Sequence, residues 1–419
     1  MIFDWKASGA FAKSLLLLRT RRFGTFWLAS LLSNIGTWAQ QVAQPWLMLS
    51  IGASSFLLGV DAFAMGAPVL LLTLVGGVLA DRGDRRRIIA SFQSVQMLCP
   101  IIVVALLVTG KIEPWMIIAC SLVVGVTDAL SMPSFQSIVP TIVEREQIAT
   151  GIALNSTQFN LSRILGPAVA GVLMASVGAA GAFAVSAASY VPFILVALWV
   201  LPRGAQPNAD GADQDLFAGV REIAREPALR GALLTALATS ALCAPLITFC
   251  PVLVKHALHQ DVGHFSLTVG AFGAGGLLGA MGLLAVDPAR DRRPLSSAFA
   301  VIYGATVAVV AIDPWASALP ALFVVAGLAM TVSNASANAM LQSVAPARIR
   351  GQSVSLFMLA MRGGVSLGSL LTGASVSALG VREALLINGV VAVLAHALIW
   401  HGWRRAELPD SRSASRAIE

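Results

Sequence analysis

The sequence predicts an all-α membrane protein with twelve transmembrane helices in two pseudo-symmetric bundles of six. Three observations lead to this class: apolar segments long enough to cross a bilayer, arginines gathered on one side of them, and a repeat that relates the two halves. Of the 419 residues, 57% are hydrophobic and 12% are charged, about half the charged share of an average soluble protein. A soluble enzyme of this composition would expose apolar surface on every side, which argues against that class.

Twelve segments have the length of a membrane-crossing helix, which needs about 20 apolar residues for a hydrocarbon core of about 30 Å. Gly and Pro inside them are acceptable because neighbouring helices can satisfy the freed backbone groups. The first six are expected at 24–49, 56–79, 88–109, 115–139, 151–175 and 179–201. The second six are expected at 229–254, 265–286, 295–312, 315–341, 352–378 and 383–403.

The basic residues agree with this number of spans. Of the 28 Lys and Arg residues, 23 fall in segments that twelve spans put on one side, 3 fall on the other side, and 2 lie within spans. The positive-inside rule assigns the basic side to the cytoplasm, so both chain ends are expected there. A wrong number of spans would have distributed the basic residues over both sides of the membrane.

A polar segment from Pro202 to Glu226 separates six spans from six, and its first residues, PRGAQPNADGADQD, are typical of a linker. Leu216 to Arg225 is expected as a short amphipathic helix on the inner surface. The predicted divisions are a cytoplasmic N-terminal segment at 1–22, a bundle at 23–201, a linker at 202–228, a second bundle at 229–403 and a cytoplasmic tail at 404–419.

Three stretches recur in the same order in the two halves, at offsets that agree to within a few residues. Such a parallel repeat of six spans is typical of secondary transporters, whose sites lie near the bilayer midplane between the halves. The pairs are GVLADRGDRRR at 77–87 with GLLAVDPARDRRP at 282–294, QSIVP at 136–140 with QSVAP at 342–346, and GPAVAG at 166–171 with GSLLTG at 368–373.

The charged stretch GVLADRGDRRR lies in the short predicted loop between the second and third spans. A topology anchor would explain its arginines but not Asp81, which directly follows the apolar run. The stretch resembles the loop motif G-x-L-A-D-R-x-G-R-R of the major facilitator superfamily, with Asp84 in place of the second glycine. Further stretches resemble its transmembrane secretion effector branch, which includes the enterobactin exporter: SNIGTWAQQVAQPWLML at 33–49, MPSFQSIVP at 132–140 and ALNSTQFNLSRILGPAVAG at 153–171.

This resemblance covers most of residues 20–400 and implies the major facilitator fold of two six-helix bundles. In that family the acid and the arginine of the loop lock the bundles together on the cytoplasmic side. The resemblance implies that Asp81 approaches the N-terminal end of the eleventh span, near Arg350, where a carboxylate gains about 0.3–1 kcal/mol from the helix dipole. A pure topology anchor stays the alternative. The expected conformational gate comprises Gly77, Asp81, Arg82, Arg85 and Arg86.

The stretch RILGPAVAG at 163–171 resembles the fifth-span motif of drug/proton antiporters, G-x-x-x-G-P-x-x-G-G. Gly166, Pro167 and Gly171 match it, whereas Ser162 and Ala170 stand in place of two glycines. The resemblance favours export over import. The alternative is close packing of helices through small residues, which can also be how the motif works.

Two charged residues are expected inside the membrane, where ionisable groups are costly and mark functional sites. Asp128 and Arg163 lie at equal depth on consecutive spans, each about 18 Å from the inner end of its helix, so they are expected to form an ion pair. Asp128 is the first candidate for a proton carrier. Asp61, the second, is expected near the outer end of its span, where solvation is the simpler interpretation.

The repeat extends this polar set to both halves, because Asp128 corresponds to Asn334 and Arg362 corresponds to Asn160. A central cavity for substrate or proton coupling is therefore predicted between the bundles. A buried ion pair that only orients helices is the alternative. The predicted lining comprises Asp128, Asn160, Arg163, Asn334, Asn338 and Arg362, together with Gln41 and Gln44 of the first span.

These patterns predict a secondary active transporter that works by alternating access, acting as a proton-coupled exporter of a small organic molecule such as a drug or siderophore-like metabolite. The alternatives are a facilitator or importer without proton coupling, or a non-transporting membrane sensor or assembly partner. No enzyme motif and no phosphate-binding loop is present, and no cofactor, metal or nucleic acid is expected. The expected partners are the substrate, protons and lipid, for a monomer in the bacterial cytoplasmic membrane.

Overall fold

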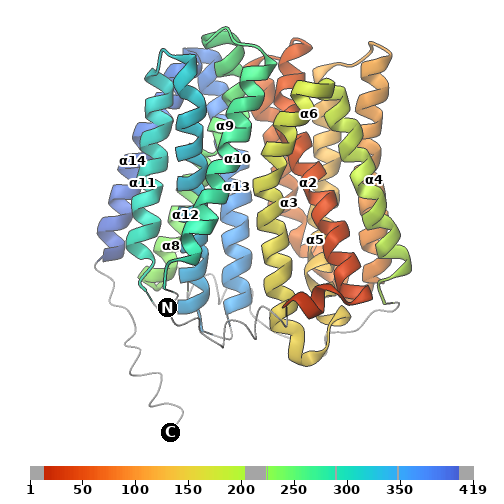
Figure 1. The fold of residues 1–419 in the computed structure, drawn as a ribbon. Coiled ribbons are helices and arrows are strands. Elements are labelled where there is room, and N and C mark those ends of the chain that lie inside the picture. Colours follow the sequence, from red (N-terminus) through yellow and green to blue (C-terminus); the bar gives the residue numbers. More distant parts are fainter. Residues whose placement is uncertain (1–13, 203–222, 224, 288–289, 347–348, 405–419) are drawn as a thin grey trace.

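The structure is a computed structural model, and it describes residues 14–202, 223, 225–287, 290–346 and 349–404. Every regular element in these ranges is a helix (Figure 1). The first half contains α2 (Arg21–Ser50), α3 (Ser55–Arg82), α4 (Arg85–Val108), α5 (Pro114–Ile142), η1 (Arg145–Gln147) and α6 (Ile148–Trp199). The second contains α8 (Pro227–Ala238), η2 (Thr239–Cys243), α9 (Pro245–Val252), η3 (Leu253–Ala257), α10 (Val262–Leu284), α11 (Arg293–Ile312), η4 (Ala316–Ala318), α12 (Leu319–Val344), α13 (Arg350–Leu379) and α14 (Val381–Arg404).

A break at Gly178 divides α6 into two parts. Gly178 has φ 68° and ψ −173°, a positive-φ conformation that glycine adopts without steric penalty. Trp27 Nε1 donates to Leu154 O (2.8 Å), near the start of α6, and the adjacent Phe26 ring packs on Phe193, near its end, with centroids 6.0 Å apart. The chain therefore reverses at Gly178, where the sequence predicts the turn between the fifth and sixth spans.

Ten helical segments among the described residues are long and apolar enough to cross a membrane. They leave out α2, which has 30 residues but carries several polar side chains, and they treat α6 as a single segment despite its break. The protein is thus an all-α, multi-pass membrane protein, while the number twelve stays a prediction. Most of the predicted amphipathic helix at 216–225, most of the linker and the C-terminal tail after residue 404 lie outside the described residues.

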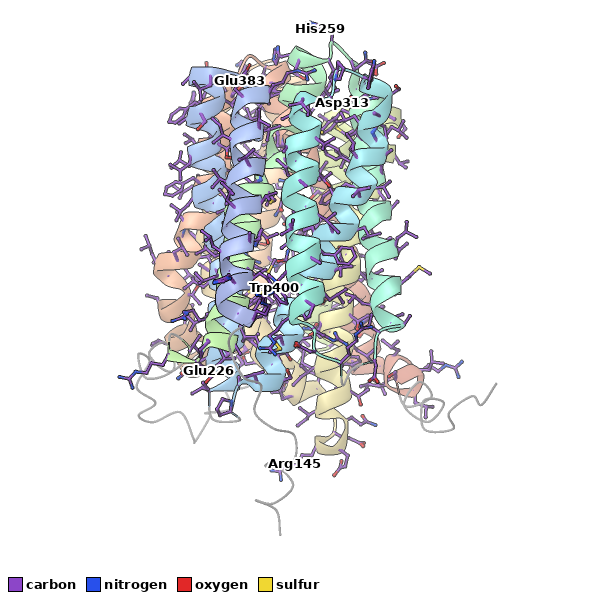
Figure 2. All side chains as sticks on the ribbon, turned by 90° about the vertical axis from the view of Figure 1, so that its left-hand side faces the viewer. Arg145, Glu226, His259, Asp313, Glu383 and Trp400 are labelled. Carbon is purple, nitrogen blue, oxygen red and sulfur yellow. The ribbon has the colours of Figure 1, made fainter. Side chains whose placement is uncertain are left out.

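The two ends of the helix bundle differ in charge. We call the end where α2 begins and α14 ends the arginine-rich end; Arg145 and Glu226 also lie there, whereas His259, Asp313 and Glu383 lie at the opposite end (Figures 1 and 2). The helices between these ends present large apolar side chains outward, as a lipid-facing surface requires. Their exposed fractions reach 76% at Leu71, 88% at Leu284 and 75% at Leu398.

Hydrogen bonds at the arginine-rich end repeat between the two halves. Asp84 caps α4 by accepting from the backbone N–H of Arg86 (3.0 Å), and Arg86 Nη1 donates to Leu198 O (2.6 Å) at the end of the predicted sixth span. Asp291 lies one residue before the N-cap Arg292 of α11 and accepts from the N–H of Arg293 (2.9 Å), and Arg293 Nη1 donates to Trp403 O (3.3 Å) at the end of the twelfth predicted span. The capping role explains why an acid replaces the second glycine of the loop motif, since Asp is a preferred N-cap residue.

Glycines repeat the same close approaches in both halves. A Cβ on Gly166 would overlap Trp38 of α2, and one on Gly368 would overlap the backbone of Ala241 in η2, so each packs on the first span of its own half. Gly171 and Gly373 instead face the other half. A Cβ on Gly171 would lie 2.6 Å from Ser266 O of α10, and one on Gly373 would lie 3.1 Å from the Cα of Gly59 in α3.

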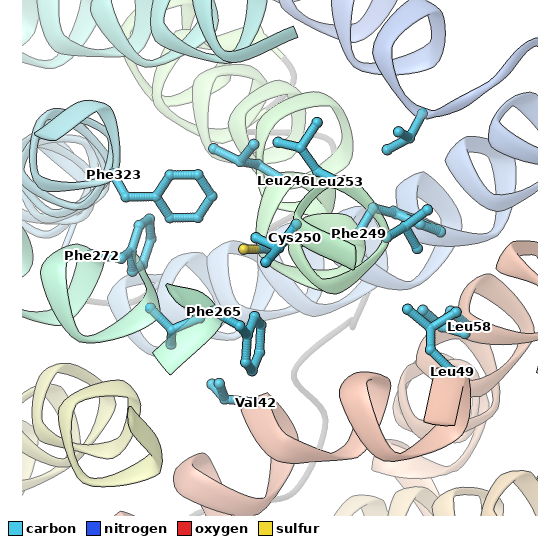
Figure 3. Close-up of a cluster of buried hydrophobic side chains, with 14 of the residues drawn as sticks. Val42, Leu49, Leu58, Leu246, Phe249, Cys250, Leu253, Phe265, Phe272 and Phe323 are labelled. Carbon is cyan, nitrogen blue, oxygen red and sulfur yellow. The ribbon is translucent and has the colours of Figure 1, made fainter. Parts of the chain in front are cut away.

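Three clusters of buried apolar side chains show where the two halves meet. The largest joins both halves and contains Leu49 and Leu58 of the first half together with Phe249 and Phe265 of the second (Figure 3). The other two lie at the arginine-rich end, one built on α2, α4, α5 and α6 and the other on α8, α12, α13 and α14. The halves therefore share one core towards the opposite end and keep separate cores at the arginine-rich end.

Candidate functional site

An ion pair joins the two halves in the interior. Arg362 Nη1 of α13 donates to Asp128 Oδ2 of α5, and both side chains are 30% exposed. Arg362 Nη2 also lies 4.0 Å from Met132 Sδ, one turn further along α5. Among the described residues this is the only ion pair between the halves, and it links the fourth predicted span to the eleventh.

The expected pair of Asp128 with Arg163 is therefore wrong. Arg163 is half-buried on α6 and makes no hydrogen bond or ion pair with any residue that the structure describes. Tyr303 of α11 is buried, and its hydroxyl has no hydrogen-bond partner within the described part of the chain. Equal depth on consecutive spans did not decide the pairing, because it says nothing about which way each helix turns its side chain.

The two predicted asparagines of α12 occupy different environments. Asn334 is 5% exposed, and its Oδ1 finds no partner among the described residues. Asn338, one turn on, is half-buried and accepts from Gln342 Nε2 (3.2 Å). The side chain of Asn160 lies outside the described residues, so its place in the predicted cavity stays a prediction.

Gln41 and Gln44 lie within the first half rather than beside the Asp128–Arg362 pair. They line a small cavity of about 10 Å³ together with side chains of α3 to α6. Gln44 is buried and donates to Asp61 Oδ2 (2.6 Å) and to Ser121 Oγ (2.8 Å), and Ser121 donates to Asp61 Oδ1 (2.6 Å). Asp61 is only 4% exposed, so its expected solvation at a helix end is also wrong.

The arginines of the charged loop contact the ends of other helices in the first half. Arg85 is 5% exposed and donates to Ala80 O (3.2 Å) and to Ser137 O (3.3 Å), at the ends of α3 and α5. Backbone carbonyls at helix C-termini carry partial negative charge, so these contacts are favourable. Gly77 has open space at its Cβ position. The side chains of Asp81 and Arg82 lie outside the described residues, so the gate stays a prediction.

Aromatic rings contribute to the contact between the halves towards the opposite end. The Trp46 ring of α2 stacks on Phe265 of α10 with centroids 4.9 Å apart, and Lys255 Nζ lies 6.0 Å from the centroid of Trp46. Pro167, inside α6, is buried beside the glycines of the fifth-span motif. The sequence did not predict the Trp46–Phe265 contact, because nothing in the pattern of apolar spans indicates that the first and eighth spans meet there.

Comparisons with known proteins identify the family. A family model described as transmembrane secretion effector matches residues 12–417. The chain belongs to this family of the major facilitator superfamily. It is similar to the multidrug efflux pump Tap of Mycolicibacterium fortuitum, with 25% identity over 87% of this chain and 93% of that protein. This family member is a membrane transporter, not an enzyme.

Two further relatives align over shorter regions. The staphyloferrin A transporter of Staphylococcus aureus is 28% identical over 41% of this chain and 44% of its own length. The enterobactin exporter EntS of Shigella boydii is 28% identical over 54% of this chain and 56% of its own length. The matched regions thus cover about half the length of each of these two relatives.

Solved transporters share the fold. The nucleoside transporter NupG superposes with a TM-score of 0.72 at 13% identity, covering 92% of this chain and all of that one. A bacterial homologue of the human lysosomal transporter Spinster, in an inward-facing and occupied conformation, superposes with a TM-score of 0.71 at 16% identity and covers 93% of this chain and 98% of its own. At such identities the likeness concerns the fold alone, and it agrees with the predicted fold class.

Proposed function

We propose that the chain is a proton-coupled exporter of a small organic molecule, such as a drug or siderophore-like metabolite, in the bacterial cytoplasmic membrane. The observation that carries the proposal is the ion pair between Asp128 and Arg362, because it joins the halves that alternating access must separate. The names of the relatives, a multidrug efflux pump and an enterobactin exporter, support export. The positive-inside rule puts the arginine-rich end in the cytoplasm.

In this proposal the described conformation faces inward. The shared apolar core and the Trp46–Phe265 stack close the outer end, and the separate cores leave the cytoplasmic end free to open. Substrate enters from the cytoplasm and meets the polar groups at mid-depth, among them the half-buried Arg163. In the outward-facing state, Asp81 and Arg85 would meet the start of α13 and hold the cytoplasmic end closed.

Asp128 is proposed to carry the proton. Its carboxylate attracts Arg362 only while it is ionised, so proton binding removes the charge that joins the two halves and frees the guanidinium. In an exporter driven by the inward proton gradient, this proton binds from the outside in the outward-facing state. The bundles then rock, and release of the proton into the cytoplasm restores the pair seen in the described inward-facing conformation. Exposed ion pairs contribute about 0–1 kcal/mol to stability, and disrupting a buried pair costs about 3–5 kcal/mol. Because both side chains here are 30% exposed, the free energy of this pair falls between these values, which suits a link that forms and breaks in each transport cycle.

The test is transport in inverted membrane vesicles with a panel of fluorescent cationic dyes, with and without an imposed proton gradient. Wild type and Glu113→Gln, which changes an exposed carboxyl at the outer end, should accumulate a dye when the gradient is present. Asp128→Asn should lose this uptake. Equal uptake by wild type and Asp128→Asn that survives collapse of the gradient would reject proton coupling and favour a facilitator.

A further inference from the structure

Asp61 forms a polar cluster inside the first half that is separate from the Asp128–Arg362 pair. Its two carboxylate oxygens each accept one hydrogen bond of 2.6 Å, from Gln44 Nε2 and from Ser121 Oγ. A third bond of 2.8 Å joins Gln44 to Ser121 and closes the cluster. All three side chains are at most 4% exposed, although they come from the three different helices α2, α3 and α5.

No cationic side chain in the described residues forms an ion pair with Asp61. The one arginine at mid-depth on a helix packed against α3 is Arg362, and it is already bonded to Asp128. The other arginines of α2 and α13 lie at the arginine-rich ends of those helices. The titratable side chains on the packed helices and around the cavity are Cys120 and Asp128 of α5, Arg362 of α13, Cys250 of α9, Cys99 of α4 and Tyr190 of α6.

A carboxylate buried without a cation is costly, and such a group is normally accommodated by binding a proton. We propose that Asp61, with Gln44 and Ser121, is a proton-binding site of the first bundle. Uptake moves a proton from a hydronium ion to a carboxylate oxygen and leaves a water molecule, and release reverses this. The proposal rests on the proton-coupled exporter proposed above and adds to it a second proton site.

The adjacent cavity supplies a route for the proton. Gln44 and Ser121 line it together with Thr37, Gln41 and Tyr190, and its volume of about 10 Å³ is near the minimum that holds one water molecule. The hydroxyl of Ser121 can donate and accept at once. It can therefore pass a proton between a water in the cavity and Asp61 Oδ1.

The position of Asp61 on α3 links its charge to the movement of the halves. Gly59 and Gly66 lie on the face of α3 that meets α13, where a Cβ on Gly59 would be 2.6 Å from Ser369 O and one on Gly66 would be 2.6 Å from Ser366 Cβ. Asp61 follows Gly59 by two residues, about 200° around the helix, and bonds to α2 and α5 instead. A change in its charge alters the packing of the same helix that contacts the second half.

The experiment measures proton binding directly, by infrared difference spectroscopy of purified full-length protein in lipid nanodiscs between acidic and alkaline pH. Wild type and Asp128→Asn should both show the carbonyl-stretch band of a buried protonated carboxyl. Asp61→Asn should lose this band and keep only the band that Asp128→Asn lacks. Glu113→Gln is the matched control at an exposed acid and should keep the band. A band that persists unchanged in Asp61→Asn, or that wild type does not show, would overturn the proposal.

A second variant keeps the test decisive if Asp61→Asn does not fold. Ser121→Ala retains the acid and removes one hydrogen bond to it, so the band should persist at a shifted frequency, and an unshifted band would contradict the cluster. In vesicles, Asp61→Asn should lower gradient-driven dye uptake by a factor of about 5–150, the usual range of coupling between sites, while dye counterflow persists. If the wild-type protein moves no dye, the proposed exporter function is rejected. The infrared spectra would still show whether Asp61 binds a proton, so the two proposals fail separately.

Discussion

Gly171 tests whether the fifth-span motif acts through close packing between the halves. We expect Gly171→Ala to weaken the closed outer end, because the new Cβ would lie 2.6 Å from Ser266 O, whereas ordinary contacts begin at 3.4 Å. The obstacle is a backbone atom, so α6 and α10 must separate by about 0.8 Å. Overpacking of this kind costs about 1–3 kcal/mol, which changes a two-state equilibrium by a factor of about 5–150.

Gly270→Ala is the matched control. Gly270 lies on α10 at the same interface, yet a Cβ there meets no atom within 4 Å. Both substitutions gain the same helix propensity of about 1 kcal/mol, so the difference between them isolates the contact with Ser266.

The readout is the distance between spin labels on exposed residues near the arginine-rich end, at Ile152→Cys of α6 and Gln342→Cys of α12, in a chain whose four native cysteines are replaced. Gly171→Ala should move the distribution towards the shorter, outward-facing distance, and Gly270→Ala should leave it unchanged. Identical distributions for the two variants would refute the packing argument.

Three further predictions follow from single contacts. Asp84→Ala removes the N-cap of α4 and should lower the free energy of unfolding by about 0.5–2 kcal/mol, measured by denaturation in mild detergent; no change would contradict the cap. Trp46→Ala removes the stack on Phe265 and should increase the outer-end opening seen by spin labels, whereas Trp46→Phe should retain most of the closure. Asp128→Arg combined with Arg362→Asp should recover part of the stability that either change alone removes, about 1–3 kcal/mol for a partly exposed pair; a double variant no better than the worse single one would show that the charges do not interact.

The sequence alone determined the architecture, because hydropathy and charge act locally along the chain. Span-length apolar runs and one-sided arginines predicted the membrane helices, and the repeat predicted that the halves are related. The structure shows this repeat in matched contacts, from Asp84 and Asp291 at the helix starts to Gly171 and Gly373 between the halves. The family likewise followed from short motifs, whose residues are held close together by the chain itself.

Only the tertiary structure decided which polar groups meet. Sequence placed Asp128 and Arg163 at one depth, but the direction in which each helix faces depends on packing across the whole bundle, and Arg362 from the other half became the partner of Asp128. Asp61 looked like an acid at a helix end, yet α2 and α5 bury it with Gln44 and Ser121. Depth along a helix is a property of sequence, whereas the environment at that depth is made by neighbours that lie far away in the chain.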